Sequence, residues 1–169
     1  MAPLPLQFLT LQSIKLPMRL SDFLVDECVL WEIKAQDKWE FFDEVARCLG
    51  KALKLPPAEI KRVLEERERL SSTAIGEEIA IPHSRLANLE RLVIAVGIKK
   101  TGLEFEALDK RPVKIVFVVL APENDQALYL RVLAQLARLL KRQEVRERLL
   151  SASSAKELRK ILAEVDEEG

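Results

Sequence analysis

The chain has 169 residues, a length typical of one domain with a full hydrophobic core. Lysine and arginine together number 27, as do aspartate and glutamate, so the net charge is zero and binding along a nucleic-acid backbone is disfavoured. The two cysteines, Cys28 and Cys48, lack the spacing of a disulfide-rich secreted domain and fit a cytoplasmic protein.

The first 17 residues are apolar but have neither the pattern of a signal peptide nor that of a membrane span. No basic segment precedes the apolar run, and Pro3 and Pro5 interrupt it. The patterned part of the chain begins at Met18. We therefore expect residues 1–17 to be an N-terminal extension, or an artefact of start-site choice, and residues 18–166 to form one domain without direct membrane insertion.

A strand and two helices are predicted in the next part of the chain. Residues 29–33 are short and rich in β-formers, which favours a first strand. Asp37 is placed as the N-cap of a helix over residues 38–49, and Gly50 is placed to help end it. Pro57 suits the first turn of a second helix that runs to about Arg69.

An arginine interrupts the apolar stripe of this second helix. The stripe consists of Ile60, Val63 and Leu64, and the next position on the same face is Arg67. One interpretation is that Arg67 lays its aliphatic stem on the core edge and keeps its charge in water. The other is that its guanidinium faces a crevice, where its planar set of donors would hold an oxyanion such as a phosphoryl group.

The only histidine of the chain, His83, follows a proline at the end of an apolar run. In an extended segment Ile79, Ile81 and His83 share one side, so the histidine takes a position that faces the core. Pro82 cannot donate to a strand ladder, so we expect the strand to stop there or to run along a sheet edge. His83 would then lie at the carboxyl end of a strand, where open α/β sheets form ligand crevices.

The chemistry of a lone imidazole allows His83 to be a nucleophile that accepts a phosphoryl group near neutral pH. The alternative is an ordinary core or surface histidine. No zinc or other metal site is expected, because the chain has no second histidine and no Cys-x-x-Cys pair to complete the ligands.

Two long apolar segments predict the centre of a sheet. Residues 92–98 and 113–121 are apolar on both faces apart from Lys114, which is typical of strands covered by helices on both sides. Between them, residues 103–108 and the turn over 109–112 suggest a short edge strand. The predicted fold class is α/β, described equally as an α+β sandwich, with a mixed sheet of about five strands and helices on both faces.

The last third of the chain predicts helices. Asn124 and Asp125 are good caps for a long helix with a broad apolar face, and Tyr129 lies on the border of that face, where it would pack with its hydroxyl in water. Ser154 begins a capping box for a closing helix. A basic patch fits either a solvated helix face or a docking surface for an acidic partner; its residues are Arg138, Lys141, Arg142, Arg146 and Arg148.

No Gly-rich phosphate loop or Walker pattern is present in the sequence, so no nucleotide cofactor is expected. Any phosphoryl group should therefore arrive already activated.

With these residues identified, the chain resembles the enzyme IIA domains of the bacterial phosphotransferase system, of the fructose/mannitol and nitrogen-regulatory type. The match consists of Arg67–Gly76, which reads Arg-Glu-Arg-Leu-Ser-Ser-Thr-Ala-Ile-Gly, followed by Ile79–His83, which reads Ile-Ala-Ile-Pro-His. It extends through residues 108–113 and 128–133 to the last helix, and covers nearly everything after residue 19.

The resemblance implies a site. His83 is the implied phosphoryl acceptor and Arg67 the implied electrostatic partner of the phosphate, while Ser72 and Thr73 match a pair of hydroxyl residues near the site. The family often has a second histidine at the position of Tyr129. A phenol can donate a hydrogen bond to a phosphoryl oxygen, but with an unperturbed pKa of about 10 it does not relay protons near neutral pH.

The resemblance implies a phosphotransferase-type carrier with a phosphohistidine intermediate, which takes its phosphoryl group from an HPr-like donor and regulates partner proteins by its phosphorylation state. One alternative is a sugar-specific fructose/mannitol enzyme IIA that passes phosphate to a IIB domain; no IIB or transmembrane segment is attached here, which favours the regulatory type. The other alternative is a binding module that kept the fold without phosphoryl transfer. Donor, target and oligomeric state stay open.

Overall fold

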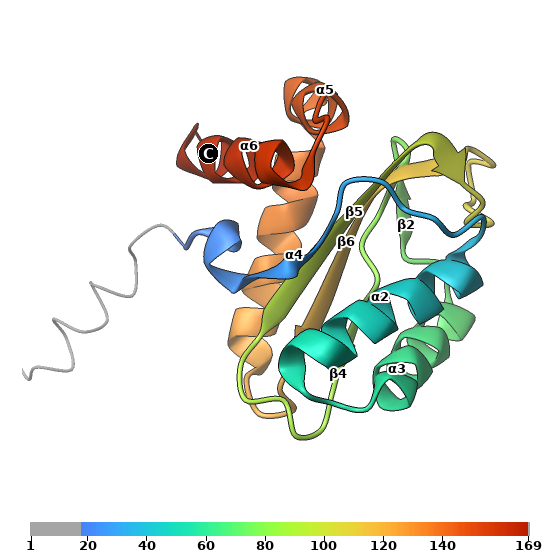
Figure 1. Ribbon diagram of the computed structural model, residues 1–169, viewed down its shortest axis with the longest axis vertical. Coiled ribbons are helices and arrows are strands. Elements are labelled where there is room, and N and C mark those ends of the chain that lie inside the picture. Colours follow the sequence, from blue (N-terminus) through green and yellow to red (C-terminus); the bar gives the residue numbers. More distant parts are fainter. Residues whose placement is uncertain (1–17, 169) are drawn as a thin grey trace, which may run out of the picture.

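The structure, a computed structural model, describes residues 18–168, and the side chains of residues 18–166. The proposed extension over residues 1–17 lies outside the described residues. A twisted sheet forms the middle layer, with helices on both faces (Figure 1). The fold predicted from the sequence is confirmed, with six strands where about five were expected.

The sheet is mixed, in the order β1-β5-β6-β3-β2, and β4 pairs separately with β6. β5 and β6 are antiparallel, whereas β1 runs parallel to β5, and β3 and β4 run parallel to β6. The strands are β1 (Leu24–Leu30), β2 (Ala74–Gly76), β3 (Ile79–Ala80), β4 (His83–Arg85), β5 (Val93–Leu103) and β6 (Val113–Ala121).

The helices divide between the two faces of the sheet (Figure 1). One apolar core lies under the first two long helices, and the other lies under the three C-terminal helices. A short 3-10 helix, η1 (Leu20–Phe23), leads into β1. The helices are α2 (Lys38–Leu53), α3 (Pro57–Leu70), α4 (Gln126–Leu140), α5 (Gln143–Leu150) and α6 (Ala155–Glu168).

The strand that carries His83 is interrupted, as Pro82 predicts. Ile79 pairs with Ile115 and His83 pairs with Val119, so β3 and β4 keep one register along β6 across the break. Ile81 turns its N–H to the carbonyl of Thr73 at 3.0 Å, and Pro82 has no N–H to give. The prediction that His83 ends a strand is wrong, because the chain resumes pairing at His83 and forms β4.

Three element boundaries differ from the prediction. The first strand is Leu24–Leu30 rather than residues 29–33, because exposed Asp26 and Glu27 hide the apolar pattern of an edge strand. Gly50 does not end α2 but lies buried inside it, where a Cβ would be 2.7 Å from the Pro57 ring. The expected edge strand over 103–108 is absent among the described strands, since β5 continues to Leu103 and Leu108 is 95% exposed.

Three of the N-cap residues proposed from the sequence, Asp37, Asp125 and Ser154, cap their helices. The Asp37 carboxylate accepts the Glu40 N–H at 2.9 Å, and the Asp125 carboxylate accepts the Leu128 N–H at 3.3 Å. The Ser154 hydroxyl also accepts an N–H, that of Glu157, at 3.1 Å. These local signals therefore place the helix starts.

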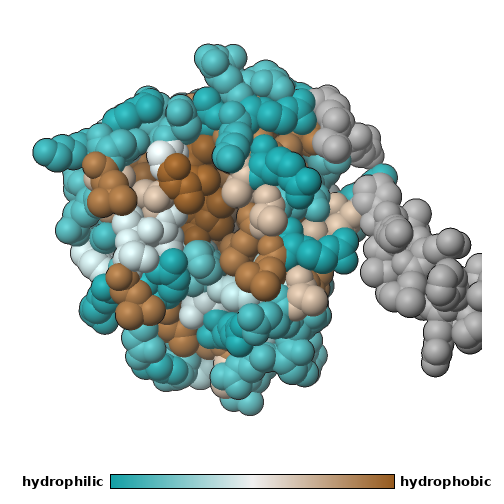
Figure 2. All heavy atoms as spheres, turned by 180° about the vertical axis from the view of Figure 1, so that it is seen from behind, coloured by the Kyte–Doolittle hydropathy of each residue, from teal (hydrophilic) through white to brown (hydrophobic). Residues whose placement is uncertain are grey.

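The face shown in Figure 2 is hydrophilic around its edge, with apolar side chains gathered towards its middle. Three arginines of the basic patch have carboxylate partners: Arg142 with Glu144, Arg146 with Glu77, and Arg148 with Glu164. This pairing fits the solvated-face interpretation of the patch. Across residues 18–168, no helix combines the length and the apolar character that crossing a membrane requires.

Candidate functional site

His83 is partly buried at the start of β4, directly after the break in the strand. Its Nδ1 lies 2.6 Å from the carbonyl oxygen of Ile81. A carbonyl oxygen only accepts, so this contact requires the proton on Nδ1 and leaves the lone pair on Nε2. The break at Pro82 therefore supplies the group that fixes the tautomer of the ring.

The pKa of His83 lies below its ordinary value of 6.5. Burial of the ring is the main cause, and the positive charge of Arg67 acts in the same direction. The hydrogen bond to Ile81 and the negative charge of Glu68 oppose them. At neutral pH the imidazole is thus uncharged, with a lone pair available for attack.

Arg67 reaches this region from the last turn of α3. Its guanidinium donates to the carbonyl of Ser71 at 2.9 Å and to the Ser71 hydroxyl at 3.4 Å. Among the described residues no carboxylate forms an ion pair with Arg67. The positive charge of Arg67 acts to lower the pKa of both His83 and Tyr129.

Tyr129 belongs to α4 and is 9% exposed, more deeply buried than the border position predicted from the sequence. Its ring centroid lies 6.0 Å from that of His83, with 57° between the ring planes. Burial raises the pKa of the phenol, while the charges of Arg85 and Arg67 oppose that rise. We call the group of His83, Arg67, Tyr129 and Arg85 the histidine site.

Ser72 and Thr73 lie in the loop between α3 and β2, and their hydroxyl groups form hydrogen bonds within this region. The Ser72 hydroxyl accepts the N–H of Ala74 at 3.2 Å. The Thr73 side chain is buried, and its hydroxyl donates to the Glu68 carboxylate at 2.6 Å. The structure thus brings His83, Arg67 and Tyr129 together, whereas Thr73 turns its hydroxyl away into the interior.

A buried ion pair anchors the loop between α3 and β2. Glu68 is 3% exposed and Lys38 is 6% exposed, and Lys38 Nζ lies 3.3 Å from a Glu68 carboxylate oxygen. The same carboxylate accepts the backbone N–H of Thr73 at 3.1 Å. Because the Thr73 carbonyl binds the N–H of Ile81, and Ile81 binds His83, hydrogen bonds connect the ion pair to the imidazole.

Sequence reasoning missed Arg85 and Lys38. Arg85 lies two residues after His83 on β4, and this alternation was the available signal for a shared face. Lys38 begins α2 and gave no signal, because its partner Glu68 lies 30 residues further along the chain.

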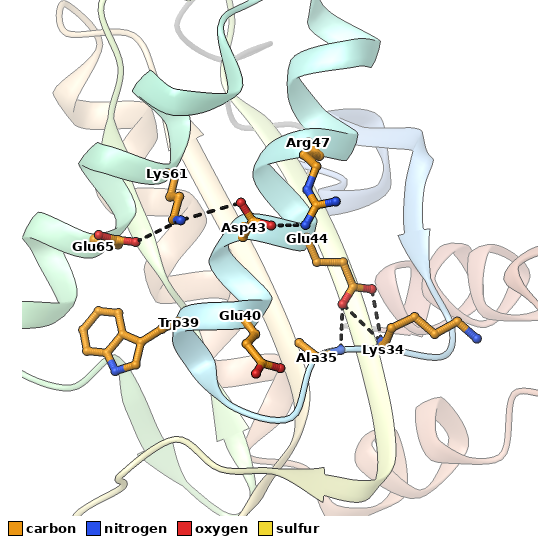
Figure 3. A pocket seen from close by; sticks show the side chains of 9 residues that line it. All are labelled: Lys34, Ala35, Trp39, Glu40, Asp43, Glu44, Arg47, Lys61 and Glu65. Carbon is orange, nitrogen blue, oxygen red and sulfur yellow. Dashed lines mark hydrogen bonds and ion pairs between the residues drawn. The ribbon is translucent and has the colours of Figure 1, made fainter.

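A cavity of about 800 Å³ lies elsewhere, between the loop after β1 and helices α2 and α3 (Figure 3). Four of its charged groups are paired with one another: Asp43 with Arg47 and Lys61, and Glu65 with Lys61. Glu44 accepts two backbone N–H groups, from Lys34 and Ala35. Each cation of the cavity wall, Lys34, Arg47 and Lys61, has a carboxylate partner, whereas Arg67 in the histidine site has none among the described residues. Residues 18–168 contain no cluster of three or more metal-ligating side chains.

Comparison with known proteins identifies the family of the chain. Residues 22–165 match the family described as "Phosphoenolpyruvate-dependent sugar phosphotransferase system, EIIA 2". A nitrogen regulatory protein of Bradyrhizobium diazoefficiens is 32% identical over 146 residues, which are 86% of this chain and 95% of that protein. The fructose-specific EIIABC component of Bacillus subtilis is 37% identical over 138 residues, or 81% of this chain, but the match spans only 22% of that longer protein.

A solved structure shows the same fold. The nitrogen regulatory protein IIA-Ntr from Neisseria meningitidis superimposes with a TM-score of 0.79 at 32% identity, covering 85% of this chain and 98% of that one. The chain belongs to the EIIA 2 family of the phosphoenolpyruvate-dependent sugar phosphotransferase system.

Proposed function

We propose that the protein is a phosphocarrier that accepts a phosphoryl group on His83 from an HPr-like phosphohistidine donor and regulates partner proteins by its phosphorylation state. The observation that carries this proposal is a partly buried imidazole whose Nδ1 is bound to the Ile81 carbonyl, together with the Arg67 guanidinium, whose charge lowers the pKa of His83 and which no described carboxylate pairs. An uncompensated cation beside a nucleophile suits an incoming dianion, because phosphoryl transfer depends mainly on positioning and charge stabilisation.

The accepting atom in this proposal is Nε2 of His83. The Nδ1 proton is engaged by the Ile81 carbonyl at 2.6 Å, which leaves the Nε2 lone pair to attack phosphorus. The P–N bond to the donor imidazole breaks as the bond to Nε2 forms, and the donor nitrogen recovers the electron pair. The Nδ1 proton stays in its hydrogen bond, where the carbonyl dipole stabilises the positive charge that develops on the ring.

Arg67 has the task of holding the equatorial phosphoryl oxygens. A guanidinium offers two parallel N–H donors to such oxygens. Its present partners, the carbonyl and hydroxyl of Ser71, are neutral. Exchanging them for phosphate oxygens therefore breaks no ion pair.

The regulatory type is the first choice because the match covers 95% of the nitrogen regulatory protein from Bradyrhizobium diazoefficiens. The second candidate is a sugar-specific enzyme IIA that hands phosphate to a IIB domain, which the 37% identity to the fructose-specific component favours. Growth of a deletion strain on fructose and mannitol separates them, since only loss of the sugar-specific type would abolish growth there.

We further propose a cytoplasmic location, residues 18–166 as the phosphoacceptor domain and residues 1–17 as an extension of it. The family match over residues 22–165 supports the domain. Cys28 and Cys48 form no disulfide although their sulfur atoms lie 2.7 Å apart, and a reducing compartment keeps such a pair as thiols, which supports the location. The intact mass of the protein made from its own genomic start tests the extension.

The deciding experiment is phosphorylation by a phosphoenolpyruvate-driven donor system, read by intact mass and by ³¹P NMR. Wild type should gain one phosphoryl group, and His83→Ala should gain none. The chain has one histidine, so no second histidine can be substituted as a control. Arg131→Gln, which changes an exposed arginine on α4, serves instead and should be labelled like wild type. Labelling of His83→Ala would remove His83 from the acceptor role.

A binding module without transfer is the remaining alternative. If His83→Ala and His83→Asp behave like wild type in the cell while a deletion does not, contact alone explains the function. Different behaviour of the two variants supports the phosphocarrier.

A further inference from the structure

The histidine site contains a second guanidinium without a described carboxylate partner. Arg85 lies two positions after His83 on β4, so the two side chains leave the strand on the same side. Its guanidinium carbon lies 5.7 Å from the centroid of the Tyr129 ring. The side-chain oxygen of Gln126, the first residue of α4, accepts a hydrogen bond from the same guanidinium and fixes it there.

The Tyr129 ring is consequently shared between His83 and Arg85. The centroid of the Tyr129 ring lies 6.0 Å from that of the imidazole. The Cζ atom of Arg85 lies over the same ring, 5.7 Å from its centroid. The charges of Arg85 and Arg67 both act on the phenol and favour its ionised form. A cation over an aromatic ring draws electron density from it, which makes the phenolic O–H a stronger hydrogen-bond donor.

We propose that the Tyr129 hydroxyl donates a hydrogen bond to the phosphoryl group on His83, and that Arg85 is the positioning residue that holds and polarises this hydroxyl. The inference rests on the proposed function of His83. A phosphoryl group carries a charge of about −2, of which Arg67 offsets one unit. Arg85, acting through the Tyr129 ring, supplies the second positive charge of the site.

No proton moves in this arrangement. Burial keeps the pKa of the phenol above its ordinary value of 10.0, so Tyr129 stays protonated and acts only as a donor. The bonds that change are the P–N bonds to the donor imidazole and to Nε2 of His83. Tyr129 and Arg85 stabilise the charge on the phosphoryl oxygens during and after that exchange.

The first test does not involve phosphate. Tyr129 is the only tyrosine of the chain, so biosynthetic fluorotyrosine gives a single ¹⁹F resonance and a phenol that titrates at lower pH. Arg85→Gln should raise the titration midpoint of this phenol, because a positive charge that favours the phenolate is lost. Arg131→Gln, which changes an exposed arginine on α4, should leave it unchanged. An unchanged midpoint in Arg85→Gln overturns the proposed pairing, whether or not the protein is phosphorylated.

The second test measures phosphoryl transfer from the donor and the lifetime of the phosphohistidine. Tyr129→Phe and Arg85→Gln should each slow transfer about tenfold, the scale of one lost hydrogen bond to a charged group. The double variant should be no slower than either single variant, and Arg85→Lys should recover part of the rate. Additive losses would show that Arg85 acts independently of Tyr129 and overturn the inference. Absence of labelling in wild type would instead overturn the proposed function.

Discussion

Two neighbouring polar regions of this molecule differ in whether their charged side chains have partners of opposite charge. In the buried ion pair, the ammonium group of Lys38 meets the carboxylate of Glu68, whose remaining acceptor positions are taken by Thr73. In the histidine site, Arg67 and Arg85 bind only neutral oxygens of described residues. Charge that the protein satisfies by itself serves the fold, whereas charge left uncompensated beside a nucleophile is available to a ligand.

The contrast is sharpest between consecutive residues of α3. Glu68 points into the interior and is 3% exposed, while Arg67 is partly exposed and bears on His83. One helix end thus contributes to both regions. The buried pair anchors the loop, and the loop carbonyl of Thr73 in turn holds the segment that orients His83.

Lys38→Met should have the largest effect, a loss of about 3–5 kcal/mol in the free energy of unfolding. The substitution keeps the volume near Trp39 and Phe105 but leaves the Glu68 carboxylate buried without its cation. Urea denaturation measures the loss. Lys51→Met, on the exposed side of the same helix, is the matched control and should change stability little. A loss below about 1 kcal/mol for Lys38→Met would mean that the pair does not support the fold.

Arg67→Gln should reduce phosphoryl transfer about 100-fold, as expected when a charge-stabilising donor is removed from a transition state. Stability should change little, because Arg67 has no described ion pair to lose. Arg69→Gln tests the comparison directly, since Arg69 lies on the same helix end but is paired with Glu65 at 3.0 Å. If both substitutions slowed transfer equally, the distinction between paired and unpaired arginines would fail.

The parts of the site that the sequence predicts are those with local signals. Pro82 marks the strand break because it has no N–H, and Arg67 stands out because it occupies an apolar position of a regular stripe. Both signals lie within a few residues of the feature they predict. The fold class follows similarly from the continuous apolar strand over residues 113–121, whose predicted bounds agree with β6.

The features that sequence reasoning missed depend on contacts between distant segments. Lys38 is an ordinary helix-start residue until α3 places Glu68 against it, and Arg85 resembles a surface arginine until α4 brings the Tyr129 ring beneath it. Gly50 was misread for the same reason: it is needed for the close approach of the Pro57 ring, rather than to end the helix. Packing of elements, which no local period encodes, decides these positions.

Thr73→Val should lower the free energy of unfolding by about 1.5–3 kcal/mol. The change keeps the shape of a buried side chain but removes the hydroxyl that donates to Glu68 at 2.6 Å. Thr73→Ser keeps this donor and should lose clearly less stability, which makes it the control for the urea measurement. Equal losses for valine and serine would indicate that the methyl group, rather than the hydrogen bond, stabilises the loop.

The smallest effect concerns the pH dependence that His83 contributes to stability. Its pKa in the folded protein is below the ordinary value of 6.5, so the unfolded chain binds the proton more readily. The stabilisation is therefore complete above 6.5 and is lost as the pH falls through 6.5 towards the lower folded value. Urea denaturation of wild type and His83→Gln, compared at about pH 7.5 and about pH 5, should show wild type losing more stability on acidification.

Arg67→Gln should weaken this dependence, because removing the nearby positive charge raises the pKa of His83 towards its ordinary value. NMR titration of the single histidine measures that shift directly. A histidine held by a carboxylate, in the manner of the buried ion pair, would have a raised pKa and would gain stability on acidification. The sign of the measured slope therefore tells whether burial together with Arg67, or a carboxylate, dominates the surroundings of His83.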